Sequence, residues 1–381
     1  MSDYFGKEIH KLGFGLMRLP KLDGVKAENG QPAIDIEQVK EMVDFFIASG
    51  GTYFDTAYVY DGGNSERAAK EALVDRYPRE SFTLATKLNA RAAANEEEAK
   101  KQFVISLERT GAGYFDFYLL HAMGADNYET YKDYHLFDFA RQLKAEGKVK
   151  HWGFSFHDKP DVLDRILTDN PDAEFVQLQI NYADWEDPGT QSKACLEMAR
   201  KHGKSVVVME PVKGGTLAQP PQSVLDIFKA ADPDASPASW AIRFVASQDG
   251  IITVLSGMSN MEQMKDNATF MKDFKPLTEA EMEVIKKAQE TLASIESIPC
   301  TGCHYCTEGC PMQINIPGIF RAVNQYMVYE NLEGAKGGYR WATGGGSKAS
   351  DCVQCGQCEA ACPQHISIIE ELQKAAELLE A

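Results

Sequence analysis

Eight of the nine cysteines in this 381-residue sequence fall in two runs near the C-terminal end, and both runs have the same spacing. Each run reads C-x2-C-x2-C-x3-C and is followed by proline, the first beginning at Cys300 and the second at Cys352. Disulfides would be typical of a short secreted domain, but the opening sequence MSDYFGKEIHKLG has no apolar segment of an export signal. Metal binding is therefore the expected use of these thiols.

Three cysteines separated by two residues can surround one face of a cubane cluster, whereas the fourth lies beyond the turn at the proline and points away. The paired runs resemble those of bacterial ferredoxins with two clusters, in which the fourth cysteine of one run completes the cluster of the other. We therefore expect two 4Fe-4S clusters, one on Cys300, Cys303, Cys306 and Cys362 and the other on Cys352, Cys355, Cys358 and Cys310. Zinc is the alternative, although zinc sites favour two C-x2-C pairs separated by a longer loop. The ninth cysteine, Cys195, lies in a helical pattern and is expected to be a core thiol.

Four further polar residues stand at or just after the ends of consecutive predicted strands. They are Asp55 and Tyr60 in FDTAYVY, Lys87 in LATKL and His121 in YLLH. Barrel enzymes carry their catalytic groups at the carboxyl ends of the strands, although a single polar residue there is more often an ordinary rim residue. Together the four could transfer a proton, because an ammonium beside a phenol favours the phenolate and a carboxylate keeps that ammonium charged.

The D-T-A-x-x-Y element, with its lysine and histidine, resembles the catalytic tetrad of the aldo/keto reductases. The resemblance extends over about residues 8 to 270, and the cysteine-rich part resembles the ferredoxin-type extension of one branch of that family. It implies that Tyr60 is the proton donor and that Lys87, held by Asp55, lowers the pKa of Tyr60. It also implies that His121 donates a hydrogen bond to the oxygen of a small carbonyl substrate.

The same resemblance implies NADPH or NADH as the hydride carrier and assigns its contacts. Ser155 and Gln177 occupy the places that hold the nicotinamide carboxamide, and Asn267 occupies that of the adenine contact. The loop that usually binds the 2'-phosphate through lysine and arginine offers Gly257 and Gln263 instead. Met209 and Glu210 replace the aromatic residue that usually stacks on the nicotinamide. These departures leave the choice between NADPH and NADH open, and they also leave open a barrel that receives electrons in another way.

The elements that must position these residues follow a regular alternation. Eight apolar or β-branched runs alternate with amphipathic helical stretches between residue 12 and about residue 270. The runs are centred near Leu12, Phe54, Leu84, Leu119, Trp152, Leu178, Val207 and Val254. Eight strand–helix units of this total length predict an α/β fold, a (β/α)8 TIM-type barrel. An open doubly wound sheet is the alternative, but no G-x-G-x-x-G follows the first run.

The chain is expected to divide into three parts: a barrel over residues 1–275, a linker helix over 276–298 and a small iron–sulfur domain over 299–381. The segment before Leu12 can form a hairpin that closes the floor of the barrel. The linker sequence LTEAEMEVIKKAQETLASIES is amphipathic and begins with a Thr278 cap. The last part, ferredoxin-like and α+β or helical, should contain an inserted helix near FRAVNQYMVYENL, a glycine-rich stretch around GGYRWATGGGSK and a final helix, IEELQKAAELLE.

The formal charge of -17, from 56 acidic and 39 basic residues, disfavours binding to nucleic acid or anionic lipid, since both are bound through clustered lysine and arginine. No stretch approaches the ~20 apolar residues that a membrane-spanning helix needs. We therefore expect a cytoplasmic protein whose partners are a small-molecule carbonyl substrate and, for electrons, a ferredoxin or a flavodoxin. The rim loops contain Met123, Tyr182, Trp185 and the stretch ADNYETYKDYH, which predict a partly aromatic substrate pocket. The alternative is that half of these residues pack under the helices.

The function expected from these features is that of an oxidoreductase that interconverts a carbonyl and an alcohol with NAD(P)H, coupled to or modulated by two 4Fe-4S clusters. The alternative is an electron-transfer module that links a nicotinamide or flavin pool to a ferredoxin partner. In a third interpretation the clusters are structural and the barrel is a regulatory binding module, against which the intact tetrad argues. A cluster transfers one electron and a nicotinamide transfers a hydride, so direct exchange between them requires a flavin or a radical-tolerant substrate.

Overall fold

The computed structural model describes residues 2–381, and the chain begins with a short hairpin. Strands β1 (Ser2–Tyr4) and β2 (Lys7–Ile9) pair antiparallel before the first barrel strand. In the turn between them, the ring of Phe5 stacks on His151 with centroids 4.4 Å apart. Because His151 lies near the amino end of its strand, the hairpin covers the floor of the barrel, as the sequence predicted.

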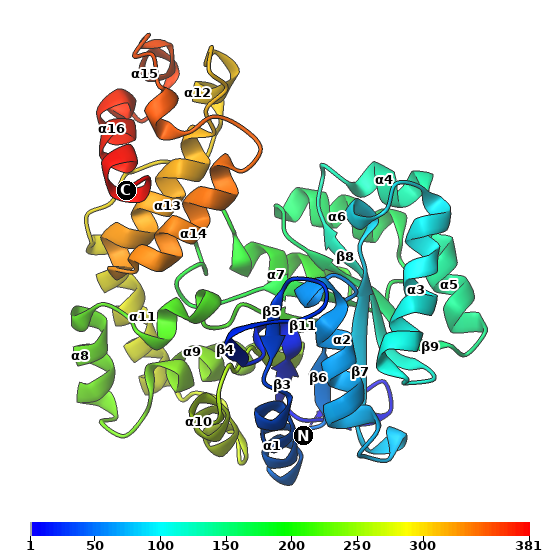
Figure 1. The fold of residues 1–381 in the computed structure, drawn as a ribbon. Helices are drawn as coiled ribbons and strands as arrows, with labels where there is room; N and C mark the ends of the chain where they lie inside the picture. Colours follow the sequence, from blue (N-terminus) through cyan, green and yellow to red (C-terminus); the bar gives the residue numbers. More distant parts are fainter. Residues whose placement is uncertain (1) are drawn as a thin grey trace. The chain divides into compact units, whose positions relative to one another are not determined.

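Eight parallel strands close into one barrel in which each strand pairs with two neighbours (Figure 1). In chain order they are β3 (Leu12–Gly15), β6 (Tyr53–Asp55), β7 (Thr83–Leu88), β8 (Phe115–Met123), β9 (Val149–Phe156), β10 (Phe175–Gln179), β11 (Ser205–Met209) and β12 (Ile251–Ser256). Strand β12 pairs with β3 and closes the ring, and a second hairpin, β4 (Lys21–Lys26) with β5 (Pro32–Ile34), follows β3. The eight barrel strands are those expected from the sequence, so the predicted barrel is confirmed.

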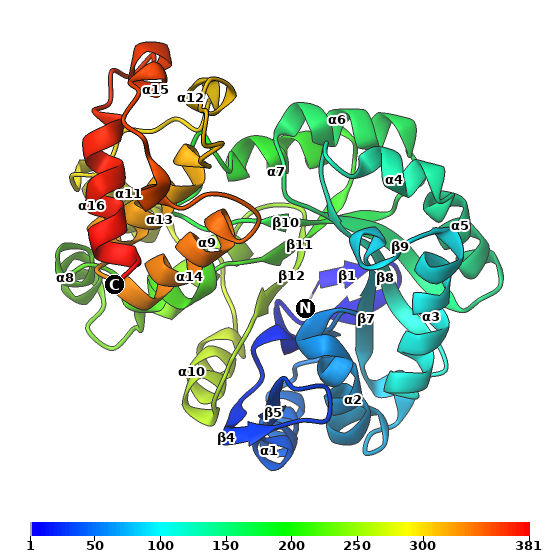
Figure 2. The same ribbon diagram turned by 45° about the horizontal axis from the view of Figure 1, so that its top comes forward.

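Helices follow the strands and cover the outside of the barrel (Figure 2). They are α1 (Ile36–Ala48), α2 (Asn64–Ala69), α3 (Glu96–Thr110), α4 (Tyr128–Asp133), α5 (Leu136–Ala145), α6 (Pro160–Asp169), α7 (Ser192–Lys201), α9 (Pro237–Ala246) and α10 (Met261–Met271). In α1 the carboxylate of Asp35 caps the helix by accepting a hydrogen bond from the Gln38 N–H. The buried residues of α1, Val39, Met42, Val43 and Phe46, recur at helical spacing and form the face that packs inward.

The inside of the barrel changes character from floor to rim. Its lower part is apolar and includes the buried side chains of Tyr53, Phe117, Phe175 and Ile252. Toward the carboxyl ends of the strands, the buried side chains are polar and include Asp55, Lys87, His121, Ser155 and Gln177. Since buried polar and charged groups are stable only with partners, this upper layer must form a bonded network.

The chain forms two compact units. One comprises the residues up to Gly214 with Ala238–Glu279, and the other comprises Gly215–Pro237 with Ala280–Ala381. The segment after Gly215, which carries α8 (Gln222–Ala231), therefore packs with a part of the chain far along the sequence. Within this second unit the side chain of Gln325 donates a hydrogen bond to Thr216 Oγ1 at 2.8 Å. The division of the chain into three consecutive parts stays a prediction.

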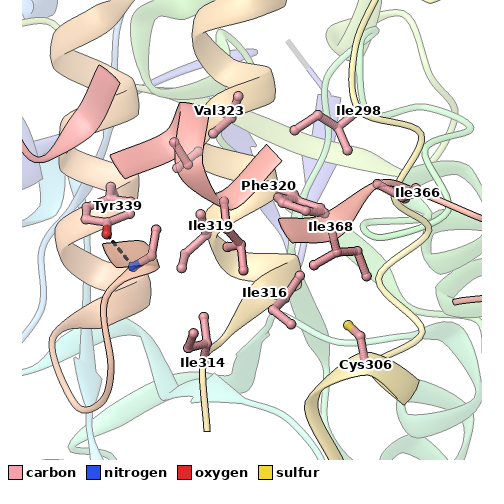
Figure 3. Packing of buried hydrophobic residues seen from close by; sticks show 14 of the residues in the cluster. Ile298, Cys306, Ile314, Ile316, Ile319, Phe320, Val323, Tyr339, Ile366 and Ile368 are labelled. Carbon is pink, nitrogen blue, oxygen red and sulfur yellow. Dashed lines mark hydrogen bonds between the residues drawn. The ribbon is translucent and has the colours of Figure 1, made fainter. Parts of the chain in front are cut away.

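The C-terminal part is built from helices: α11 (Glu279–Ser294), α12 (Tyr305–Glu308), α13 (Ile316–Tyr329), α14 (Leu332–Thr343), α15 (Gln357–Ala361) and α16 (Ile368–Leu379). Helices α13 and α16 are the inserted and final helices that the sequence predicted. Much of the glycine-rich stretch is helical in α14, which packs against α13: a Cβ on Gly338 would lie at an ordinary contact distance of 3.5 Å from the Ala322 Cβ. Figure 3 shows the core that joins them, with Ile319, Phe320 and Tyr339 packed together. Among residues 2–381, no helix combines the length and the apolar composition required to cross a membrane.

Candidate active site and cysteine pockets

Adjacent barrel strands carry the four predicted catalytic residues to one rim. Asp55 is the last residue of β6, Lys87 lies one residue before the end of β7, and His121 lies two residues before the end of β8. Tyr60 follows in the loop after β6, at the first position of a 3-10 turn. Strand β7 pairs parallel with both β6 and β8, so these side chains reach the same end of the barrel.

Lys87 is the centre of the site. Its ammonium donates hydrogen bonds to the carboxylate of Asp55, to the backbone carbonyl of Thr56 at 2.7 Å and to the hydroxyl of Tyr60 at 3.3 Å. The rings of Tyr60 and His121 meet edge to face, with centroids 5.6 Å apart. Lys87 is fully buried, whereas Tyr60 is partly exposed. The structure thus brings all four residues together at one place on the rim.

Burial and charge pairing act in opposite directions on the ion pair between Lys87 and Asp55. Burial alone would lower the pKa of Lys87, but Asp55 and Tyr60 stabilise the ammonium and hold that pKa above its ordinary value. Burial raises the pKa of Asp55, whereas Lys87 and the side-chain amide of Gln177 act to lower it. Lys87 therefore keeps its charge at neutral pH.

The lowering of the pKa of Tyr60 that the family resemblance implied is not found in the protein alone. Desolvation raises the pKa of Tyr60 above its ordinary value of 10.0, and Lys87 opposes this effect. The carboxylates of Asp55 and Glu210 raise it further. Because one ammonium does not offset desolvation and two carboxylates, Tyr60 keeps its proton at neutral pH, which is the protonation state of a proton donor.

His121 is uncharged at neutral pH. Burial holds its pKa well below 6.5, and the positive charge of Lys87 lowers it further. The hydroxyl of Tyr131 donates a hydrogen bond to the backbone carbonyl of His121. Among the described residues, the buried Nδ1 of His121 has no hydrogen-bond partner. A buried acceptor without a partner is tolerated better than a buried N–H, so the proton is favoured on Nε2, which can then donate.

Two of the predicted cofactor residues contact the tetrad or its strand directly. Ser155 Oγ accepts a hydrogen bond at 2.7 Å from the N–H of Ala122, the residue after His121. Gln177 Nε2 donates to the carboxylate of Asp55 at 3.2 Å. The sequence assigned both side chains to the cofactor, so these contacts within the protein were missed. The backbone carbonyl of Thr56 was missed as well, because a carbonyl is common to every residue and leaves no signal in a sequence.

The other two predicted cofactor residues, Gln263 and Asn267, lie one turn apart in α10. Asn267 Nδ2 donates to the hydroxyl of Ser256, the last residue of β12, at 2.7 Å. The side-chain carbonyl of Gln263 accepts from the Ser259 N–H at 2.8 Å, and Asn260 caps α10 through the Gln263 N–H. These bonds fix the connection between β12 and α10, and they are separate from the bonds of the tetrad.

The expected aromatic lining of the substrate pocket is wrong for Met123 and Tyr182, because both side chains are fully buried in the protein core. Trp185 packs edge to face against a ring of α9 with centroids 5.2 Å apart. The rim carries an exposed ion pair instead, in which Arg18 contacts Glu210 at 3.3 Å. Met123 and Tyr182 thus follow the alternative that the sequence left open, in which such residues pack inside the protein.

Two pockets in the second unit are lined by the eight predicted cluster cysteines. The first has a volume of about 320 Å³, which includes space open to solvent, and its lining includes Cys300, Cys303, Cys306 and Cys362. The second, likewise open to solvent, has a volume of about 310 Å³, and its lining includes Cys310, Cys352, Cys355 and Cys358. Each pocket therefore combines three cysteines of one run with the last cysteine of the other.

The surroundings of these thiols suit an iron–sulfur cluster. Most of the other lining residues of both pockets are apolar, although Thr301, His304 and Gln364 also line the first, and Ile316 lines the two of them. Four thiols lining a mainly apolar space fit a 4Fe-4S cluster, in which four cysteine thiolates hold the irons. Within residues 2–381, no group of three or more His, Cys, Asp or Glu side chains is close enough to bind a single metal ion. A 4Fe-4S cluster does not require such a group, because it is larger than one ion and its cysteine ligands lie further apart. Cys195, in the first unit, is not a lining residue of either pocket, and burial raises its pKa to about 12, as expected for an unreactive core thiol.

The family model of the aldo/keto reductases matches residues 11–290, which cover the barrel and its catalytic rim. The chain belongs to the aldo/keto reductase family. A model of the 4Fe-4S dicluster domain matches residues 299–367, so this aldo/keto reductase carries an iron–sulfur domain after its barrel. It is an oxidoreductase whose fold and cysteine-rich extension are those expected from the sequence.

Known relatives of this aldo/keto reductase match its barrel. The uncharacterized oxidoreductase YqkF of Bacillus subtilis is 24% identical over 280 residues, which cover 64% of this chain and 85% of the relative. The structure of aldo-keto reductase AKR11C1 from Bacillus halodurans, in its holo form, has a TM-score of 0.60 at 24% identity and covers 74% of this chain and 93% of its own. An aldo-keto reductase from Klebsiella pneumoniae in complex with NADPH has a TM-score of 0.58 at 21% identity, over 73% of this chain and 90% of its own.

Proposed function

We propose that this protein interconverts a carbonyl and an alcohol with NADPH or NADH, and that Tyr60 transfers the proton. The observation that carries the proposal is the contact of the Tyr60 hydroxyl with the buried ammonium of Lys87, beside the edge of the His121 ring. A bound nicotinamide supplies or takes up the hydride. All other parts of the chemistry fall to side chains of this barrel.

Each member of the tetrad has a role that its environment supports. Tyr60 is protonated at neutral pH and donates its proton to the carbonyl oxygen during reduction. Lys87 stabilises the phenolate that remains, and Asp55 keeps Lys87 charged and fixed. His121, neutral and protonated on Nε2, donates a hydrogen bond to the substrate oxygen, where negative charge develops.

The cofactor would be held along the rim by Ser155, Gln177, Gln263 and Asn267. The NADPH complex of the Klebsiella pneumoniae relative supports a nicotinamide cofactor on this fold. Ser155 and Gln177 stand beside the tetrad, which suits contacts to the reactive ring, and Gln263 and Asn267 stand in the helix after the last strand. The bonds that these side chains make within the protein would hold them in place for the cofactor.

The second unit would hold two 4Fe-4S clusters, one in each cysteine-lined pocket. The first pocket offers Cys300, Cys303, Cys306 and Cys362, and the second offers Cys310, Cys352, Cys355 and Cys358. Bound clusters supply one-electron transfer, which either couples to turnover or modulates it. Apolar side chains of the pockets would limit the access of water to the buried sulfurs of Cys306, Cys358 and Cys362, and solvent access is one of the properties that set cluster potentials.

A second candidate function is favoured by the exposure of Cys303 and Cys355. One cysteine of each pocket is open to solvent. A ferredoxin or flavodoxin could therefore approach either cluster closely, and the protein would link a nicotinamide or flavin pool to that carrier. Under this alternative, the carbonyl chemistry of the barrel is secondary.

One set of experiments on anaerobically purified full-length protein separates these functions. We expect NADPH- or NADH-dependent reduction of members of a panel of aldehydes and ketones, and a loss of ~10²- to 10⁴-fold in Tyr60→Phe, because general acid catalysis has that magnitude. The control is Tyr58→Phe, which removes a hydroxyl from the same loop while its ring lies over Arg109 rather than Lys87. Turnover that survives in Tyr60→Phe would contradict the mechanism. Bleaching of the cluster absorbance by NADPH without any carbonyl turnover would favour the electron-transfer module.

A further inference from the structure

The strand that carries His121 changes its backbone geometry directly after that residue. The pairing of β8 with β9 shifts register between Leu120 and Met123. Inside this irregularity Ala122 has a φ of +53°, in the left-handed region. For alanine that conformation is disfavoured about 5- to 30-fold relative to ordinary backbone, so contacts from outside the strand must hold it. Such bulges re-aim side chains near active sites.

Two buried side chains hold the left-handed residue from both sides. Ser155 Oγ accepts the hydrogen bond of the Ala122 N–H at 2.7 Å. Asn127 Nδ2 donates to the Ala122 carbonyl at 2.9 Å, and Asn127 Oδ1 accepts from the Gly124 N–H, also at 2.9 Å. The peptide groups next to Ala122, which the irregular strand pairing would leave without partners, are thereby satisfied.

The contacts of Asn127 use both the N–H donor and the carbonyl acceptor of its side-chain amide. It is the residue before α4, and within the described chain its side chain makes no capping bond to that helix. Its side chain instead spans the loop after His121, and the residue is 4% exposed. Aspartate has no donor for the Ala122 carbonyl, and alanine has neither donor nor acceptor. Either change would leave buried backbone groups without partners, which is costly.

We propose that Asn127 is a positioning residue that fixes Ala122 in its left-handed conformation and thereby aims the imidazole of His121 at Tyr60. The bonds from Asn127 act on the peptide that follows His121, and the ring of His121 lies against the ring of Tyr60. Removal of Asn127 would let Ala122 return to ordinary backbone conformations, in which the His121 side chain leaves its present direction. The kinetic part of this inference rests on the proposed function, whereas its structural part does not.

The first test measures the direction of His121 without any substrate. Full-length protein is labelled with nitrogen-15 histidine, and the imidazole signals of His121 are assigned by their loss in His121→Gln. We expect these signals to shift or broaden in Asn127→Ala and in Asn127→Asp. A second change, Ala122→Gly, should restore them, because glycine adopts positive φ without cost and no longer needs the clamp. The control is Asn170→Ala, which removes another buried amide, bonded to Tyr128 and to the Ile166 carbonyl.

The second test measures turnover of benzaldehyde with NADPH. We expect kcat to fall about 5- to 30-fold in Asn127→Ala, with the KM for NADPH unchanged, and to recover most of this loss in the double variant with Ala122→Gly. Asn170→Ala should lower thermal stability and leave kcat unchanged. Unchanged His121 signals in Asn127→Ala, or no recovery with glycine at residue 122, would overturn the proposal. If wild-type protein reduces no carbonyl, the proposed function fails, and the spectroscopic result still decides the role of Asn127.

Discussion

Replacement of Lys87 by methionine separates the stabilising role of this residue from its chemical role. Lys87 is fully buried and forms an ion pair with Asp55, which is buried as well. The variant leaves the carboxylate of Asp55 buried without its counter-charge, and breaking such a pair costs about 3–5 kcal/mol of the free energy of unfolding. The double variant Asp55→Asn with Lys87→Met removes both charges. It should recover most of that stability, since Gln177 can still donate to the asparagine side chain.

The effect of Lys87→Met on catalysis follows from its distance to Tyr60. At 3.3 Å and an effective dielectric constant of about 20, a full negative charge on the phenolate interacts with the ammonium by about 5 kcal/mol. If half of that charge has developed in the transition state, the loss is about 2.5 kcal/mol, or about 70-fold in rate. This loss should appear in the single variant and persist in the double variant.

The assay combines urea unfolding, followed by circular dichroism, with the rate of carbonyl reduction at saturating NADPH. We expect the double variant to unfold near the wild-type midpoint and to remain at the low rate of the single variant. A double variant that recovers turnover together with stability would refute the reasoning, because Lys87 would then act only by holding the fold. Binding of NADPH, measured by fluorescence titration, checks that the cofactor still occupies the site.

Three further predictions concern pH and the clusters. Because the pKa of Tyr60 lies above its ordinary value, the rate of carbonyl reduction should stay level between about pH 6 and 9, whereas alcohol oxidation, which needs the phenolate, should rise over the same range in steady-state assays. The pKa of His121 is lowered in the folded protein, so the unfolded chain takes up the proton first as the pH falls through 6.5. The midpoint of urea unfolding should therefore decrease below that pH, and it should decrease less in His121→Gln. Cys362→Ser and Cys310→Ser should each lose about half of the iron, and each should alter a different cluster signal in electron paramagnetic resonance spectra. The control, Cys195→Ser, should retain all of the iron. Loss of the same cluster in both variants would contradict the pocket assignment.

The sequence alone determined the order and type of the elements, because the information lies in local patterns. Alternation of apolar runs with amphipathic stretches requires parallel strands with helical crossovers, and the eight strands appeared where the runs predicted them. The spacing within a run of cysteines is also a local pattern, because residues three apart lie within one turn of the chain. The sequence therefore predicted the cluster cysteines. The strand-end positions of Asp55, Lys87 and His121 placed these residues on one rim before any contact between them was known.

Only the tertiary structure decided how distant groups act on one another. The balance that raises the pKa of Tyr60 depends on desolvation and on Glu210, neither of which follows from the spacing of the tetrad. Three features join segments far apart in the chain: the bond from Gln177 to Asp55, the bond between left-handed Ala122 and Ser155, and the packing of Gly215–Pro237 with the C-terminal helices. A sequence records which residues can make such contacts, whereas burial, register and distance, which fix the energies, exist only once the chain has folded.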